Sequence, residues 1–188
     1  LIVGYYPVRD LNGYGKNTLL RTQSRSRWLL SKLVWIVCMV IAYYIVIYSA
    51  SFIFALFTGN SLSFMPGEYI TRLFYDIDLQ DIYVENFVIF IITMPMLTSI
   101  VASIVQVMMS YIISPFISFL AIIVVMLSST YISNPALIGN ASMVIRSRFA
   151  TPVGFTAEET VLYLAIYLIA ALIIGFVYFG NKDILNKD

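Results

Sequence analysis

The stretch LVWIVCMVIAYYIVIYSASFIFALFTGNSLSFMPG, from Leu33 to Gly67, contains no charged residue. Two further uncharged runs follow, from Asn86 to Ile145 and from Thr160 to Asn181. Each run exceeds the roughly 18 to 20 apolar residues with which a helix crosses a bilayer. Of the 188 residues, 61% are apolar and 11% are charged, whereas a soluble domain carries about 25% charged residues. The sequence therefore predicts an all-α, polytopic membrane helix bundle.

Proline and turn signals divide these runs into separate spans. Pro115 interrupts the middle run, because proline and the residue before it disfavour helix continuation. The four expected spans are 28–57, 86–111, 116–132 and 159–180. Pro95 lies inside the second span and is expected to kink it, which a membrane helix tolerates when neighbouring groups satisfy the freed carbonyl.

The connecting segments differ in charge. Residues 8–32 hold six cations and one acid, and short basic flanks stay in the cytoplasm. Residues 1–27 are therefore expected to be a cytoplasmic connecting segment, in which residues 1–7 are either the tail of an earlier span or a loop. Segment 58–85 has five acids and one arginine and is expected to be an external acidic loop. Residues 181–188 are expected to be a cytoplasmic tail, so that both visible ends lie inside.

Segment 133–158 combines turn signals with an apolar centre, ALIGNASMVI, that is too short to span a bilayer. It is expected to be an external re-entrant segment before the last span. This arrangement leaves Arg146 and Arg148 outside, against the usual bias of cations towards the inside. An arrangement with one span fewer would place Arg146 inside and the tail outside, and it stays open. Glu158 and Glu159 are interpreted as acids that complement a helix dipole.

The chain lacks the residues of most catalytic and ion-coupled machinery. It has no histidine, which excludes histidine-based zinc sites and Ser-His-Asp triads. GYGKNT, at 13–18, lacks the first glycine and the final hydroxyl of a phosphate-binding loop. The expected spans hold no acid beyond Glu159 at the very start of the last one, and Gln106 is interpreted as a helix–helix contact. We therefore expect no catalytic residue, no metal site and no cofactor on this chain, and energy for any transport from a partner.

Two segments resemble the permease subunits of type-2 ATP-binding-cassette exporters, bacterial peptide-antibiotic and immunity exporters in particular. In LLRTQSRSRWLLSKLVWI, which enters the first span, the matching positions are Arg21, Ser24, Arg25, Trp28 and Lys32. In ALIGNASMVIRS, before the last span, they are Leu137, Gly139, Asn140, Ser142, Met143 and Arg146. KDIL, from Lys182 to Leu185, is also similar.

The resemblance implies a permease of six spans, of which the four expected here are the last. It implies ATP-binding-cassette ATPase subunits as partners, which would bind ATP and Mg²⁺, together with a second copy or a homologous permease in a bacterial cytoplasmic membrane. Contact with the ATPase would fall to Arg21, Ser24, Arg25, Arg27, Trp28 and Lys32. The plain alternative is that these cations bind anionic lipid and fix the topology.

Spans without buried charge suit export of a hydrophobic or amphiphilic cargo, either a peptide or a lipid-like compound. The competing function is a non-transporting scaffold or assembly subunit of a membrane protein complex. No nucleic-acid partner is expected.

Overall fold

The computed structural model describes residues 2–13, 15, 18, 21, 24–59, 88–148 and 154–181. Over these residues the fold is helical, with one isolated bridge between Ser147 and Phe155. The elements are α1 (Ile2–Asn12), α3 (Arg25–Phe57), η2 (Ile89–Thr93), α6 (Met94–Ile112), α7 (Pro115–Tyr131), η3 (Ile138–Ser142), η4 (Val144–Arg146) and α8 (Ala157–Asn181). The expected acidic loop beyond residue 59 and the expected tail from residue 182 lie outside the described residues.

Three helical segments are long and apolar enough to cross a membrane: Arg25–Phe57, Ile89–Ile112 and Ala157–Asn181. Helix α7 is equally apolar but shorter, with 17 residues. The predicted all-α fold is confirmed for the described residues, and these helices are compatible with an integral membrane protein.

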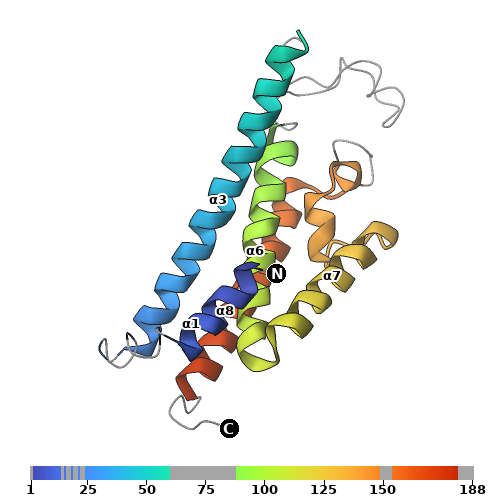
Figure 1. Cartoon of the computed structure of the whole chain (residues 1–188). Coiled ribbons are helices and arrows are strands. Elements are labelled where there is room, and N and C mark those ends of the chain that lie inside the picture. The colour runs from blue at the N-terminus through green and yellow to red at the C-terminus, as the bar shows by residue number, and fades with distance from the viewer. Residues whose placement is uncertain are drawn as a thin grey trace.

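Helix α6 lies at the centre of the bundle and packs against α8, α7, α1 and α3 (Figure 1). The long helix α3 contributes only its first half to the core, where Trp28, Leu29, Leu33, Ile36 and Val40 are buried. Helix α1 packs against α6 and α7, so the first part of the expected connecting segment is a packed helix.

Helices α6 and α8 approach each other closely at Gly175. A Cβ atom there would overlap the side chain of Met108. Small residues allow this kind of close contact between membrane helices, and Gly175 therefore sets the spacing of the two central helices.

The segment before Pro95, where the sequence predicts a kink, has a wider helical turn. Proline has no N–H group to bond the carbonyl of Ile91, and η2, a π-helix, absorbs the irregularity at 89–93. Tyr48 of α3 donates its hydroxyl to the carbonyls of Ile91 and Ile92, at 3.4 and 3.3 Å. The hydroxyl of Tyr44 donates to the Pro95 carbonyl at 3.0 Å. The neighbouring helix α3 thus donates to the Ile91 carbonyl, which the proline leaves free, and to two carbonyls beside it.

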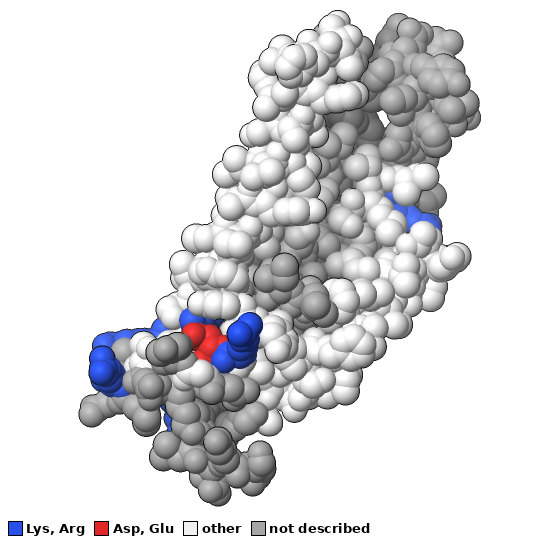
Figure 2. All heavy atoms as spheres, in the orientation of Figure 1, with Lys and Arg blue, Asp and Glu red and all other residues white. Residues whose placement is uncertain are grey.

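Charged side chains of the described residues form two groups. On the face drawn in Figure 2, the first group shows basic and acidic atoms, the second shows basic atoms only, and uncharged surface lies between them. The first group, which we call the basic end, contains Arg9, Asp10, Arg21, Arg25, Arg27 and Lys32. The second, which we call the capping end, contains Arg146, Arg148, Glu158 and Glu159.

Candidate functional site

The first turn of α3 forms the centre of the basic end. Ser24 is its N-cap and accepts a hydrogen bond from the backbone N–H of Arg27 at 3.5 Å. Serine is favoured at this position because its hydroxyl satisfies an N–H group that has no partner within the helix. Ser24, predicted as a coupling residue, therefore fixes where α3 begins.

Two side chains of this turn fasten α3 to the last turn of α8. Arg25 Nη1 donates to the carbonyl of Gly180 at 2.7 Å. Trp28, which is 5% exposed, stacks on Phe179 with ring centroids 5.5 Å apart and planes 9° from parallel. The last carbonyls of a helix lack intrahelical partners and favour a nearby cation. The two contacts therefore join the start of α3 to the end of α8.

Lys32 joins α3 to α1. Its Nζ lies 2.7 Å from Asp10 Oδ2, in a pair whose side chains are 15% and 20% exposed. The same Nζ lies over the rings of Tyr6 and Trp28, at 5.0 and 5.4 Å from their centroids. A largely desolvated cation with both an anion and aromatic faces beside it is held firmly, so α1, α3 and α8 meet at one point.

The six predicted coupling residues therefore divide into two kinds. Ser24, Trp28 and Lys32 make contacts within the chain, and Arg25 does so from an exposed position. Arg21 and Arg27 are exposed. The spacing of the motif does not reveal this division. Which of its residues make internal contacts depends on where α1 and α8 lie in the folded chain.

The second predicted segment, the re-entrant motif, forms the capping end. Helix α7 is about 25 Å long at 1.5 Å per residue, and the carbonyls at its end require partners. Asn140, which is 2% exposed, donates from Nδ2 to the carbonyls of Ile132 and Asn134, both at 2.8 Å. Arg146 Nη2 donates to the carbonyl of Thr130 at 3.1 Å. The motif thus supplies the groups that terminate α7.

The remaining motif residues shape the same turn. A Cβ atom on Gly139 would lie 2.6 Å from Ser129 Oγ, so only glycine allows this approach to α7. Ser142 Oγ donates to the Gly139 carbonyl at 2.8 Å. The carbonyl of Leu137 accepts from the backbone N–H of Asn140 at 3.0 Å, and the N–H of Met143 donates to the Asn140 carbonyl at 3.1 Å. The hydroxyl of Tyr167 on α8 donates to the carbonyl of Ala136, which ties the turn to the last helix.

Helix α8 begins with a reciprocal pair of hydrogen bonds that the sequence reasoning missed. Thr156 Oγ1 accepts from the N–H of Glu159 at 3.1 Å, and Glu159 Oε2 accepts from the N–H of Thr156 at 3.0 Å. This is a capping box, whose T-x-x-E spacing is legible in the sequence. Glu159 thus has a structural role at the helix N-terminus, in line with the interpretation of this acid pair.

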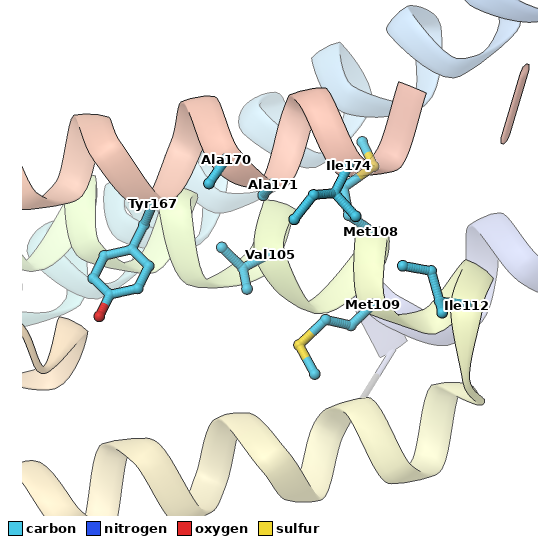
Figure 3. Close-up of a pocket in the computed structure, with 8 residues that line it drawn as sticks. All are labelled: Val105, Met108, Met109, Ile112, Tyr167, Ala170, Ala171 and Ile174. Carbon is cyan, nitrogen blue, oxygen red and sulfur yellow. The ribbon is translucent and has the colours of Figure 1, made fainter. Parts of the chain in front are cut away.

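Two further features complete the candidate site. An apolar groove of about 230 Å³ lies between α6 and α8 and opens to the surface (Figure 3); it is lined by Val105, Met108, Met109, Ile112, Tyr167, Ala170, Ala171 and Ile174. Gln106 is 7% exposed, and its Nε2 has no hydrogen-bond partner among the described residues. Gln106, interpreted as a helix–helix contact, is thus buried in α6 without a hydrogen bond from its amide nitrogen to the described residues. No cluster of three or more His, Cys, Asp or Glu occurs in the described part of the chain.

A family model matches residues 1–185 and so covers every helix described above. The chain belongs to this family, which is described as "Protein of unknown function (DUF2705)". No curated protein and no solved structure matches the chain. Its function must therefore be inferred from the contacts of its own residues.

Proposed function

We propose that the chain is the membrane-spanning permease subunit of an ATP-driven exporter, with ATP hydrolysis on separate ATP-binding-cassette ATPase subunits. In this proposal α3, α6, α7 and α8 are the spans, and a second copy or a homologous permease completes the pathway. The basic end faces the cytoplasm of a bacterial cell and the capping end faces outside, since short basic flanks remain inside.

The observation that carries the proposal is the junction at the basic end. Arg25 and Trp28 fasten the first turn of α3 to Gly180 and Phe179 of α8, and Lys32 adds α1 through Asp10. Arg21 and Arg27 are exposed beside this junction. A partner that pulls on these arginines would move three helices together, which is what coupling to an ATPase requires.

The absence of charged residues from the proposed spans supports an energy source on a partner chain. From Leu33 to Gly59, from Val88 to Ile145 and from Thr160 to Asn181, the described chain carries no ionisable acid or base except tyrosine and one cysteine. Proton- and ion-coupled transporters place acidic or basic side chains within their spans. The apolar lining of the open groove between α6 and α8 suits a hydrophobic or amphiphilic cargo, such as a peptide or a lipid-like compound.

The test is co-purification of the tagged full-length chain in mild detergent, followed by mass spectrometry of its partners. We expect an ATP-binding-cassette ATPase in stoichiometric amount. The double variant Arg21→Glu/Arg27→Glu should lower its recovery by about tenfold, because attractive surface contacts become repulsive. Arg148→Glu, at the capping end, is the matched control and should have no effect.

The alternatives predict other results. A constant set of other membrane proteins without an ATPase would favour a scaffold or assembly subunit. Recovery of the ATPase that is equal for the double variant and the wild type would assign the exposed arginines to lipid binding and topology alone.

A further inference from the structure

The two halves of α3 are attached to the bundle in different ways. The first half buries five apolar side chains between Trp28 and Val40, and Arg25 and Lys32 fasten its first turns to α8 and α1. The second half, from Ile41 to Phe57, has no buried side chain. We call it the outer half of α3. Tight packing of this helix therefore ends after Val40.

Two tyrosines hold the outer half against η2 and the start of α6. Tyr44 donates its hydroxyl to the carbonyl of Pro95 at 3.0 Å, and Tyr48 reaches the carbonyls of Ile91 and Ile92 at 3.4 and 3.3 Å. The two tyrosines are one turn apart and therefore lie on the same face of α3. Among the described residues, the hydrogen bonds from the outer half to other elements come from these two side chains alone.

Apolar packing adds little to this attachment in a bilayer. Lipid chains are as apolar as leucine, so two helices gain no hydrophobic free energy by exchanging lipid for each other. In the outer half, every side chain except those of Tyr44, Tyr48 and Ala55 is exposed, and lipid can surround these exposed side chains in any position of the half. The tyrosine hydroxyls are therefore what favours the observed position.

A local substitute exists for the hydrogen bond from Tyr44. Ser99 Oγ lies 2.8 Å from the Tyr44 hydroxyl, and Ser99 follows Pro95 by four residues. Serine and threonine hydroxyls in helices can bond the carbonyl four residues earlier, and Thr98 already does so to Met94 at 2.8 Å. A rotation of Ser99 would therefore satisfy the Pro95 carbonyl after Tyr44 leaves. The carbonyls of η2 have no such substitute at position 95, because proline has no N–H group.

We infer that the outer half of α3 is a hinged arm, which swings away from η2 and α6 about a hinge between Val40 and Tyr44. Tyr44 and Tyr48 hold the arm closed. In the exporter proposed above, the arm would control access between the lipid and the segment around Pro95; π-helical turns such as η2 are frequent at functional sites. The inference itself rests on contacts within the chain and on its helices lying in a bilayer. It does not rest on the permease role, so either can fail without the other.

Distances between pairs of spin labels test the hinge in the full-length chain, reconstituted in nanodiscs and measured by double electron–electron resonance. Every variant carries Cys38→Ser, which removes the one native cysteine. The outer pair, Phe57→Cys with Tyr131→Cys, labels the last residues of α3 and α7, whose side chains are 87% and 86% exposed. The inner pair, Leu30→Cys with Ile117→Cys, labels exposed positions near the start of the same two helices.

The double variant Tyr44→Phe/Tyr48→Phe removes both hydroxyls and keeps both rings. The ratio of long to short distances in the outer pair should rise about tenfold, the effect of losing two hydrogen bonds between membrane helices. The inner pair should keep its wild-type distances, which also shows that the double variant is folded. Tyr43→Phe is the matched control, because it removes a hydroxyl from an exposed side chain next to Tyr44. It should leave both pairs unchanged.

Three results would overturn the inference. Unchanged outer distances in the double variant would mean that the hydroxyls do not hold the outer half. An equal change in the inner pair would mean that α3 moves as one rigid helix without a hinge after Val40. An equal change in Tyr43→Phe would mean that the effect does not depend on the bonds to η2 and α6.

Discussion

The basic end and the capping end use arginine in opposite ways. At the basic end, Arg25 reaches from one helix to the last carbonyls of another, and Arg21 and Arg27 beside it are exposed. At the capping end, Arg146 turns towards the protein, where it satisfies the carbonyl of Thr130 and leaves its Nε buried. The first end joins α1, α3 and α8 and leaves two arginines exposed, whereas the second terminates a short helix.

The two ends therefore differ in what their contacts do: one connects helices to each other, and the other stabilises the end of a single helix. Side chains at the basic end connect α1, α3 and α8, so a force on one reaches the others. Side chains at the capping end donate hydrogen bonds to backbone carbonyls of and just beyond α7, which have no intrahelical partner. We therefore expect substitutions at the capping end to reduce stability, and those at the basic end to affect coupling more than stability.

The largest effect is expected from Asn140→Ala. The substitution removes two hydrogen bonds from a buried side chain and leaves the carbonyls of Ile132 and Asn134 without their partner. An unsatisfied buried group costs about 1–3 kcal/mol. Because both carbonyls are only partly buried, we expect the free energy of unfolding to fall by about 2–4 kcal/mol, the lower part of the range for two such groups. Unfolding with a denaturing detergent, followed by circular dichroism, measures this change.

Asn134→Ala is the matched control for that substitution. Asn134 Oδ1 accepts one hydrogen bond, from the N–H of Ala136, at an exposed position. Its loss should cost less than about 1 kcal/mol. If the two variants have the same free energy of unfolding, the Asn140 amide does not stabilise the end of α7. The proposed structural role of the capping end would then be wrong.

The residues of the capping end show what the sequence can and cannot predict. The charge-free runs and Pro115 are local signals, and they suffice to predict apolar helices with a break at 112–115, which the structure narrows to 113–114. The capping box of Thr156 and Glu159 is equally local and could have been read from its spacing. The role of Asn140 could not, because its partners belong to the end of another helix and become neighbours only when the chain folds.

The junctions between helices escape sequence analysis for the same reason. Pro95 predicts an irregular helix that requires outside partners, but nothing local identifies Tyr44 and Tyr48 as those partners. Likewise, the motif around Arg25 predicts a surface that contacts a partner. Which of its residues instead contact the rest of the chain depends on the position of α8.

An intermediate effect is expected from Gly175→Ala, which tests the packing between the two ends. The new methyl group would overlap Met108, and overpacking of this kind costs about 1–3 kcal/mol. Gly180→Ala on the same helix is the control, because nothing lies within 4 Å of its added Cβ. Thermal unfolding in detergent measures the effect: the midpoint temperature should be lower for Gly175→Ala and unchanged for Gly180→Ala. Equal midpoints would show that α6 and α8 separate easily and that Gly175 does not set their spacing.

The smallest effect on stability, and the most informative for function, is expected from Arg25→Ala. The lost hydrogen bond to Gly180 lies at an exposed position, so unfolding should change by only about 0.5–1 kcal/mol. Arg27→Ala is the control, since Arg27 is exposed on the same turn and should leave the stability unchanged. Chemical unfolding of both variants measures the difference.

The same pair of variants distinguishes docking of a partner from transmission of its movement. If Arg25 transmits force from α3 to α8, Arg25→Ala should retain the ATPase in co-purification and lower substrate-stimulated ATP hydrolysis, because the two helices no longer move together. Arg27→Ala should instead weaken retention of the ATPase. Loss of the ATPase from both variants to the same degree would mean that Arg25 is a docking residue, and that the contact between α3 and α8 carries no movement of its own.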